Sequence, residues 1–260
     1  MPVVEGIDPI WLAEALRRDP VQHSFAAWDV RNEPDRIRLV SWTKNGTTAG
    51  YLLIWLADPA HPFVHWFGGT DSIAELGPKL PPRPLTLVVP EEVAPFAAEA
   101  RAPVTSERIL RLTARPSAPL AGSDDPRVRE LGPRDLTTLR AWAEPHSDQM
   151  ARGYARFDPA RHVAWGAFDG ARIVGAAFAS VRLPEIWSFN GIYVEPGSRG
   201  HGLGAALSAR AVEAARRAGA IAHLNVRESN AAARRVYAHL GFREHDRLLW
   251  MESTFPAPNR

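Results

Sequence analysis

The sequence contains no cysteine among its 260 residues. A chain without thiols can form no disulfide, no thiolate metal site and no cysteine nucleophile. Lysine is nearly absent as well, since Lys44 and Lys79 are the only two. Neither lies near the glycine-rich segment described below, so a Schiff-base lysine is disfavoured. Nearly all of the positive charge is therefore arginine.

The chain also lacks a large net charge and long apolar runs. The formal net charge of +2 is too small to indicate a nucleic-acid partner. No run approaches the roughly 18 apolar residues of a membrane helix, and the first segment, with its early acidic residues, is unlike a signal peptide. We therefore expect a cytoplasmic protein that binds neither nucleic acid nor a membrane. Hydrophobic residues make up 45% of the chain, which is enough for one large core or two ordinary ones.

The first half of the chain predicts a mixture of helices and strands. A helix over 8–18 has Asp8 as its N-cap and Pro9 at its first position. Two strands, 36–43 and 48–57, flank the strong hairpin signal Asn45-Gly46. The other expected elements are a helix over 20–28, a strand over 62–69, a weak helix over 71–76, a strand over 85–89, a helix from 90–92 and a strand over 106–115. This order is typical of an α+β fold with a mixed sheet.

The second half repeats landmarks of the first. A linker is expected at 117–125, in a stretch rich in Pro, Ser, Gly and Asp. At a constant offset of 124, Pro133 follows Pro9, Asp169-Gly170 follows Asn45-Gly46, and Trp187 follows Phe63. A fixed period indicates a duplicated unit. We therefore predict two α+β domains, 1–116 and 126–260, the second with helices from Pro133 and near Pro145.

A glycine-rich turn occurs in the second copy only. Residues 192–207 predict a short strand, a turn at Pro196-Gly197 and a helix entered through three alternate glycines. The start of a helix carries unpaired N–H groups and a partial positive charge, which suit a pyrophosphate. The same offset leads to 75–80, where Pro78 blocks a helix and Glu75 repels an anion. Only the second domain is therefore expected to bind a phosphate.

Two motifs in the second domain point to a known family. Arg199, Gly202 and Gly204 match the R/Q-x-x-G-x-G/A turn, and Asn230, Ala233 and Tyr237 match N-x-x-A-x-x-x-Y, followed by Leu-Gly-Phe. Over 127–251 the chain resembles the GNAT superfamily of acyl-CoA N-acyltransferases. The first half resembles a degenerate copy of the same fold without its cofactor turn. On their own, the glycines would equally fit a helix-packing turn and Tyr237 a core position.

The resemblance implies acetyl-CoA or another short acyl-CoA as co-substrate, and no metal. The implied cofactor-binding residues are Ile192, Tyr193, Val194, Arg199, Gly200, His201, Gly202, Leu203, Gly204, Ala205, Asn230 and Ala233. Tyr237 would protonate the departing thiolate. Without cysteine, direct attack by an amine in a ternary complex is the simplest course. Some members of the family use a glutamate on the fourth strand as the base, but Ser188 falls near that position here. Glu185 is the nearest carboxylate, and a water held by Ser188 or Asn190 is an equal alternative.

The acceptor is expected to be a small-molecule or peptide amine, and the protein a monomer or homodimer. Acceptor contacts are expected from Trp187, Ser188, Asn190 and His146, with Asp148 beside them. A second hypothesis is a non-catalytic acyl-CoA sensor, favoured by the poorly defined base. A third is an NAD-dependent enzyme, because Gly200 to Ala205 also satisfy G-x-G-x-x-A and Glu228 follows. The intervening segment 195–199 and the preceding hairpin argue against that third hypothesis.

Overall fold

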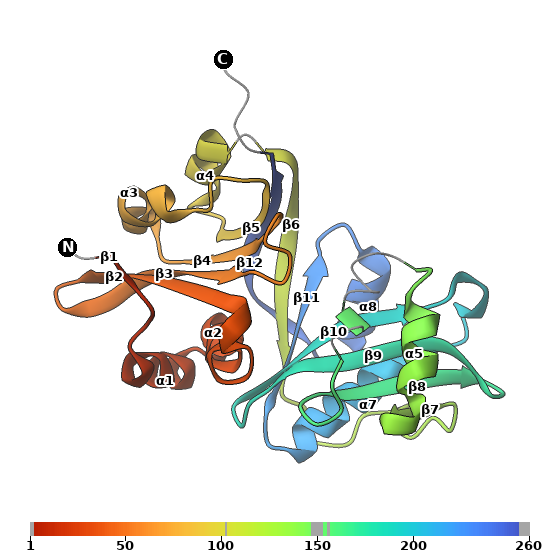
Figure 1. The fold of residues 1–260 in the computed structure, drawn as a ribbon. Coiled ribbons are helices and arrows are strands. Elements are labelled where there is room, and N and C mark those ends of the chain that lie inside the picture. The colour runs from red at the N-terminus through yellow and green to blue at the C-terminus, as the bar shows by residue number, and fades with distance from the viewer. Residues whose placement is uncertain (1–2, 102, 147–152, 155–156, 255–260) are drawn as a thin grey trace. The chain divides into compact units, whose positions relative to one another are not determined.

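The computed structural model describes residues 3–101, 103–146, 153–154 and 157–254 (Figure 1). The chain forms two compact units that are each discontinuous in sequence. Unit 1 consists of Met1–Arg111, Arg227–Ser229 and His245–Arg260, and unit 2 of Leu112–Val226 and Asn230–Glu244. The stretch 117–125, where a linker was expected, lies within unit 2. Each unit is a mixed α+β sheet with helices on both faces, which confirms the expected fold class.

The sheet of unit 1 has the strand order β1-β2-β3-β4-β5-β12-β6. Its strands are β1 (Val3–Glu5), β2 (Ile37–Lys44), β3 (Thr47–Trp55), β4 (Phe63–Phe67), β5 (Leu85–Pro90), β12 (Arg243–Ser253) and β6 (Pro103–Ala114). Of the last two strands, the part of β12 from His245 onward and the part of β6 up to Arg111 belong to unit 1. The pairs β1–β2, β2–β3, β3–β4 and β12–β5 are antiparallel, and β4–β5 is parallel. Asn45 and Gly46 have φ of 54° and 78°, as a two-residue type I′ hairpin requires.

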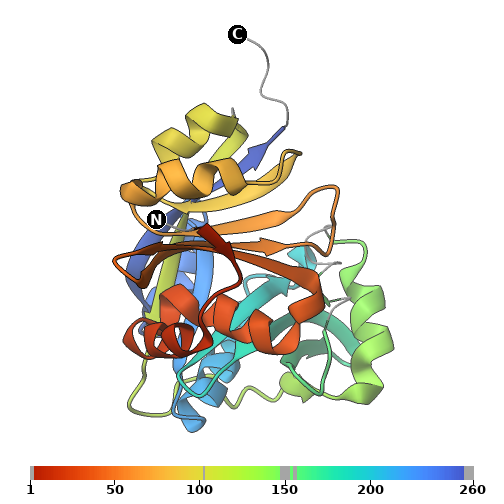
Figure 2. The ribbon, with the colours of Figure 1, turned by 60° about the vertical axis from the view of Figure 1, so that its left-hand side comes forward.

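Helices cover both faces of this sheet (Figure 2). The helices α1 (Pro9–Arg18) and α2 (Pro20–Asn32) cover one face, and the Asp8 and Asp19 side chains cap them. On the other face lie α3 (Ile73–Leu76) and α4 (Ala94–Arg101), with the short 3₁₀ segments η2 (Thr70–Ser72) and η3 (Gly77–Lys79) beside α3. The first core contains Leu12, Tyr51 and Phe67, and the second Leu52, Leu76, Leu80 and Val93.

The first-half counterpart of the glycine-rich turn is filled with core side chains. Residues 75–80 form the end of α3 and all of η3, and Leu76 and Leu80 are buried. In place of a free helix N-terminus, this segment presents apolar side chains to the sheet. Unit 1 is thus a degenerate copy of the fold, as expected from Glu75 and Pro78.

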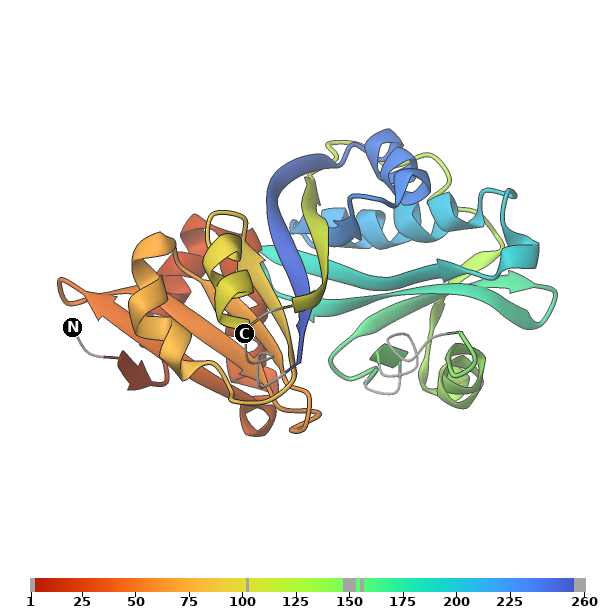
Figure 3. The same ribbon diagram turned by 90° about the horizontal axis from the view of Figure 1, so that it is seen from above.

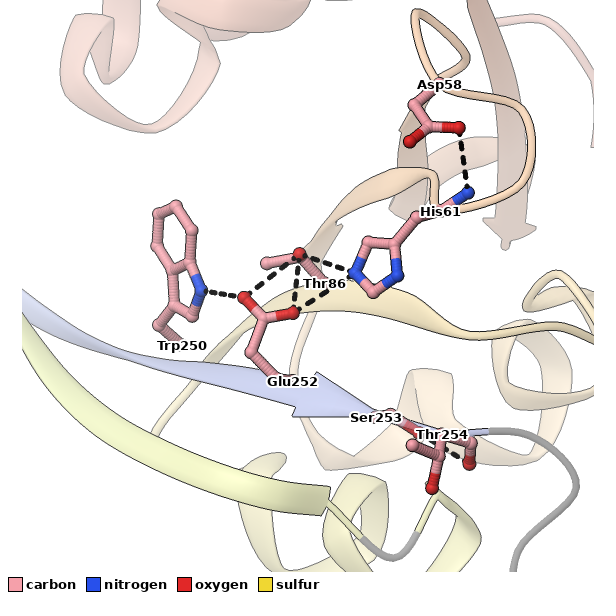
Figure 4. Close-up of polar contacts among 7 residues, drawn as sticks. All are labelled: Asp58, His61, Thr86, Trp250, Glu252, Ser253 and Thr254. Atoms are coloured by element: carbon pink, nitrogen blue, oxygen red, sulfur yellow. Dashed lines mark hydrogen bonds and ion pairs between the residues drawn. The ribbon is translucent and has the colours of Figure 1, made fainter. Parts of the chain in front are cut away.

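The last strand of the chain is fastened to unit 1 by a polar cluster (Figure 4). The Glu252 carboxylate accepts hydrogen bonds from Thr86 Oγ1 at 2.9 Å and Trp250 Nε1 at 2.8 Å, and lies 3.1 Å from His61 Nε2. One residue on, Ser253 Oγ donates to the Arg101 carbonyl at 2.7 Å. The strand β12 pairs with β5 from Leu248 to Ser253 and so adds a strand to the sheet of unit 1. The polar cluster stabilises this pairing.

The sheet of unit 2 has the order β11-β10-β9-β8-β7. Its strands are β7 (Val128–Leu131), β8 (Val163–Asp169), β9 (Arg172–Arg182), β10 (Ile186–Val194) and β11 (Ile221–Arg227, to Val226). The helices α7 (Leu203–Arg217) and α8 (Ala231–His239) lie on one face and α5 (Leu136–Ala143) on the other (Figure 3). Most of the helix expected near Pro145, and Asp148, lie outside the described residues. None of the described helices is long and apolar enough to cross a membrane.

Candidate active site

The parallel strands β10 and β11 of unit 2 pair over only part of their length. Their register runs from Ile186 opposite Ile221 to Phe189 opposite Leu224 and ends there. Just beyond, the register between β10 and β9 shifts between Asn190 and Tyr193, and Gly191 has φ of 61°. These are the marks of a β-bulge, which bends a strand away from its neighbour. Beyond Phe189 the described residues of β10 have no partner in β11, so this edge can accept an extended ligand except at the Gly191 and Val194 carbonyls, which accept from the Tyr154 hydroxyl and Arg199 Nε.

The glycine-rich turn follows directly after β10. Gly200 and Gly202 have φ of 81° and 79°, and a Cβ on either would meet no atom within 4 Å. The helix α7 begins at Leu203, and its first bond runs from Ala206 N to the Gly202 carbonyl at 3.0 Å. The N–H groups of residues 203–205 have no carbonyl four residues earlier in the helix, so they face open space at its positive end.

Arginine side chains brace this turn. Arg199 Nε donates to the Val194 carbonyl at 2.9 Å, and its guanidinium lies 5.4 Å from the centre of the Tyr193 ring. Arg127 Nη2 donates to the His201 carbonyl at 3.2 Å. The first contact joins a side chain of the loop to the end of β10, and the second joins a carbonyl of the loop to Arg127, just before β7. A turn at a helix N-terminus can receive an anion, and the open space at Gly200 and Gly202 leaves room for one.

Tyr237 is a buried residue of α8. Asn230 caps that helix by accepting from Ala233 N at 3.1 Å. The Tyr237 ring packs on Phe242 with centroids 5.6 Å apart, and the residue is 7% exposed. Burial raises its pKa to about 12. No residue that the structure describes makes a hydrogen bond to its hydroxyl. The group is therefore a neutral proton donor over the whole physiological range.

The structure places the expected base and acceptor residues along β10. Glu185 lies in the tight turn before the strand, five residues ahead of Asn190, which corresponds to about 16 Å of extended chain. Its Oε2 is buried without a hydrogen-bond partner among the described residues. Trp187 is half-buried beside the Arg182 guanidinium, 4.8 Å from its ring centre. Asn190 lies next to the bulge and donates from Nδ2 to Ser180 Oγ.

Ser188 pairs with a residue that the sequence did not single out for this site. Its Oγ lies 2.8 Å from His223 Nδ1, in the second-last pair of the β10–β11 register. Both side chains are buried. Strand alternation marks each as an inward position of its own strand, but no sequence signal places one opposite the other.

His146 lies at the end of β10. Its ring is 4.8 Å from the Tyr193 ring, and its buried Nε2 is 3.9 Å from Glu195 Oε1. Glu195 accepts hydrogen bonds from Trp142 Nε1 at 2.9 Å and Arg172 Nη1 at 2.5 Å. The structure therefore brings His146 and Tyr193 together, whereas Ser188 lies at the other end of the strand. Among the described residues, no group of three His, Asp or Glu side chains could hold a metal ion.

The diverging parallel strands, the helix N-terminus beside them and the buried tyrosine are the features that the resemblance to acyl-CoA N-acyltransferases implied. Residues 131–242 match the model of the Acetyltransferase (GNAT) family, so this part of the chain is a GNAT acetyltransferase domain. The class and family expected from the two motifs are confirmed. The antiparallel order of β7 to β10 is not that of a doubly wound sheet, so the NAD hypothesis has no support in the fold.

Solved structures resemble most of the chain. A putative GNAT-family acetyltransferase from Novosphingobium aromaticivorans has 26% identity and a TM-score of 0.58, covering 77% of this chain and 86% of that one. A tandem GNAT protein from the clavulanic acid biosynthesis pathway has 17% identity and a TM-score of 0.62, covering 98% and 100%. A GCN5-related N-acetyltransferase from Sphaerobacter thermophilus has 16% identity and a TM-score of 0.61, covering 97% and 95%. No curated protein matches the sequence.

Proposed function

We propose that unit 2 transfers an acetyl or short acyl group from acyl-CoA directly to an amine, in a ternary complex. The acceptor is a small molecule or peptide, and the reaction takes place in the cytoplasm without nucleic acid or membrane, in a monomer or homodimer. The observation that carries the proposal is the unpaired edge of β10 beside the open glycine turn. A ligand with an extended arm and a pyrophosphate matches both features.

The co-substrate would lie along this edge and end at the turn. Residues 192–194 would pair with the pantetheine arm as an added strand does. The N–H groups of residues 200–205 would receive the pyrophosphate, and Asn230 and Ala233 would border the arm from α8. The open space at Gly200 and Gly202 supports this fit, because a side chain there would stand where the phosphates belong.

Tyr237 is the proposed general acid. An amine must lose a proton to attack, and the departing thiolate must gain one. The attacking nitrogen forms its bond to the acyl carbon, the carbon–sulfur bond breaks, and the Tyr237 hydroxyl proton goes to sulfur. The amine proton goes to Glu185, or to a water held by Ser188 or Asn190. The variant Glu185→Gln separates these: lost turnover at unchanged cofactor affinity identifies the carboxylate, and retained turnover identifies the water.

Thermal unfolding with and without acetyl-CoA tests the binding site. Ligand that binds the folded state raises the melting temperature. Gly202→Asp should abolish the rise, because it adds a negative side chain at the anion site. Gly170→Asp is the matched control, since Gly170 also has a positive φ of 58° and open space, but in the β8–β9 hairpin. An equal rise in Gly202→Asp and wild type would contradict the assignment.

A screen of amines, amino acids and peptides identifies the acceptor. Thiol release reports transfer directly, because the protein has no cysteine and coenzyme A is the only thiol formed. Binding of acetyl-CoA without release in the presence of any acceptor would favour the sensor hypothesis.

A further inference from the structure

A buried tyrosine from outside both motifs holds the bulge of β10. The Tyr154 hydroxyl donates to the Gly191 carbonyl at 2.8 Å, and Tyr154 is fully buried. The ring belongs to the core beneath α5 and packs on Phe178 with centroids 5.0 Å apart. Gly191 lies within the register shift of β10 against β9, two residues past the last pair of β10 with β11.

Gly191 is confined by the same two side chains. A Cβ at this position would come within 3.0 Å of both the Tyr154 and the Phe178 rings. Its φ of 61° also favours glycine. A glycine can adopt many other conformations, so this one must be stabilised from outside. The hydroxyl of Tyr154 donates a hydrogen bond to Gly191, and the Tyr154 and Phe178 rings limit the space around it.

We infer that Tyr154 is a positioning residue for acyl-CoA. Its hydroxyl holds the Gly191 carbonyl so that the bulge keeps residues 192–194 turned away from β11 and open to the pantetheine arm. The inference rests on the proposed function. A buried tyrosine hydroxyl needs a hydrogen-bond partner, and any nearby carbonyl could supply one. The carbonyl that Tyr154 bonds belongs to Gly191, the irregular residue of β10, so the contact also fixes the shape of the strand.

The test compares two ligands of unequal length by titration calorimetry. Acetyl-CoA contacts both the strand edge and the turn, and adenosine 3′-phosphate 5′-diphosphate contacts only the turn. Tyr154→Phe keeps the ring and removes the bond to Gly191. We expect the affinity for acetyl-CoA to fall roughly 2- to 10-fold, as the loss of one hydrogen bond allows. The affinity for the nucleotide should not change.

Two further variants complete the test. Gly191→Ala disturbs the same bulge from the strand side and should give the same selective loss. Tyr51→Phe is the matched control, because Tyr51 is also fully buried and its hydroxyl lies 2.9 Å from His23 Nδ1 in unit 1. It should change neither affinity.

The outcomes separate this inference from the proposed function. Equal losses for both ligands in Tyr154→Phe, or no loss for either, would overturn the positioning role. Failure of the wild-type protein to bind acetyl-CoA at all would overturn the proposed function itself.

Discussion

Ser188 and His223 form a buried hydrogen bond, 2.8 Å long, between β10 and β11. It lies one residue pair before the register of the two strands ends at Phe189 and Leu224. The strands are thus joined by side chains as well as main chain at the base of the opening where acyl-CoA is proposed to bind. A buried polar pair of this kind stabilises the fold only while both side chains are present, because either one alone would be a buried polar group without its partner.

Ser188→Ala should destabilise unit 2 by about 1–3 kcal/mol, because Nδ1 of a buried histidine loses this partner. Urea unfolding, with hydrogen exchange to assign the loss to β10 and β11, measures the change. Ser24→Ala is the control: Ser24 is also buried, but its hydroxyl has no hydrogen-bond partner among the described residues, so its removal should cost nothing. Equal costs for the two variants would contradict the role given to the pair.

Tyr237→Phe should lower kcat by about 10²-fold or more while acetyl-CoA affinity stays nearly unchanged, since only proton donation is removed. Thiol release and thermal shift measure the two quantities. The packing on Phe242 is preserved, so the melting temperature should stay close to that of the wild type. Because burial raises the pKa of Tyr237 to about 12, its ionisation should not limit the activity below about pH 11. Unchanged turnover would make Tyr237 a core residue only.

Unit 1 should lose stability in mild acid. Burial lowers the pKa of His23 to about 4 and that of His65 to about 3. In the unfolded chain both would titrate near pH 6.5, so between that pH and about 4 the unfolded state binds more protons. The free energy of unfolding should therefore fall as the pH drops through this window.

His65→Phe should reduce this pH dependence, since His65 already packs among phenylalanine rings such as Phe25 and Phe67. Urea unfolding of unit 1 at pH 7 and pH 5, followed by hydrogen exchange, measures the slope. The exposed His239 in unit 2 serves as control through His239→Gln. An unchanged slope in His65→Phe would show that this ring protonates freely in the folded state.

Asp29 should weaken unit 1 increasingly as the pH rises from about 4 to about 7. The side chain lies in α2 and is 5% exposed, and its burial raises the pKa to about 7, against the opposing effect of a hydrogen bond from Trp55. The folded state thus holds a proton that the unfolded state loses near pH 4, so the contribution of Asp29 to stability falls as the pH rises toward 7, opposite in sign to that of the two histidines. Asp29→Asn should raise the melting temperature at pH 8 and leave it nearly unchanged near pH 4. A gain of equal size at both pH values would rule out titration as the cause.

Local signals predicted the elements of this fold well. The cap at Asp8, the Asn45-Gly46 hairpin and the start of α7 after Gly202 depend on residues a few positions apart, and the structure confirms them. The one strand that was missed in the first half is β1, only three residues long. The recurrence at an offset of 124 also appears as two similar units, because repeated sequence forms repeated structure.

Contacts between distant residues were decided only by tertiary structure. The segment from His245 completes the sheet of unit 1, where Glu252 meets Thr86 and His61, although the sequence places it in the second predicted domain, 126–260. Ser188 meets His223, and Tyr154 meets Gly191, through strand register and core packing that leave no mark in either local segment. The sequence by itself determined the elements, the duplication and the acyltransferase family. The three-dimensional packing decided which strands close each sheet and which side chains shape the opening in β10, because those depend on contacts that form only when the chain is folded.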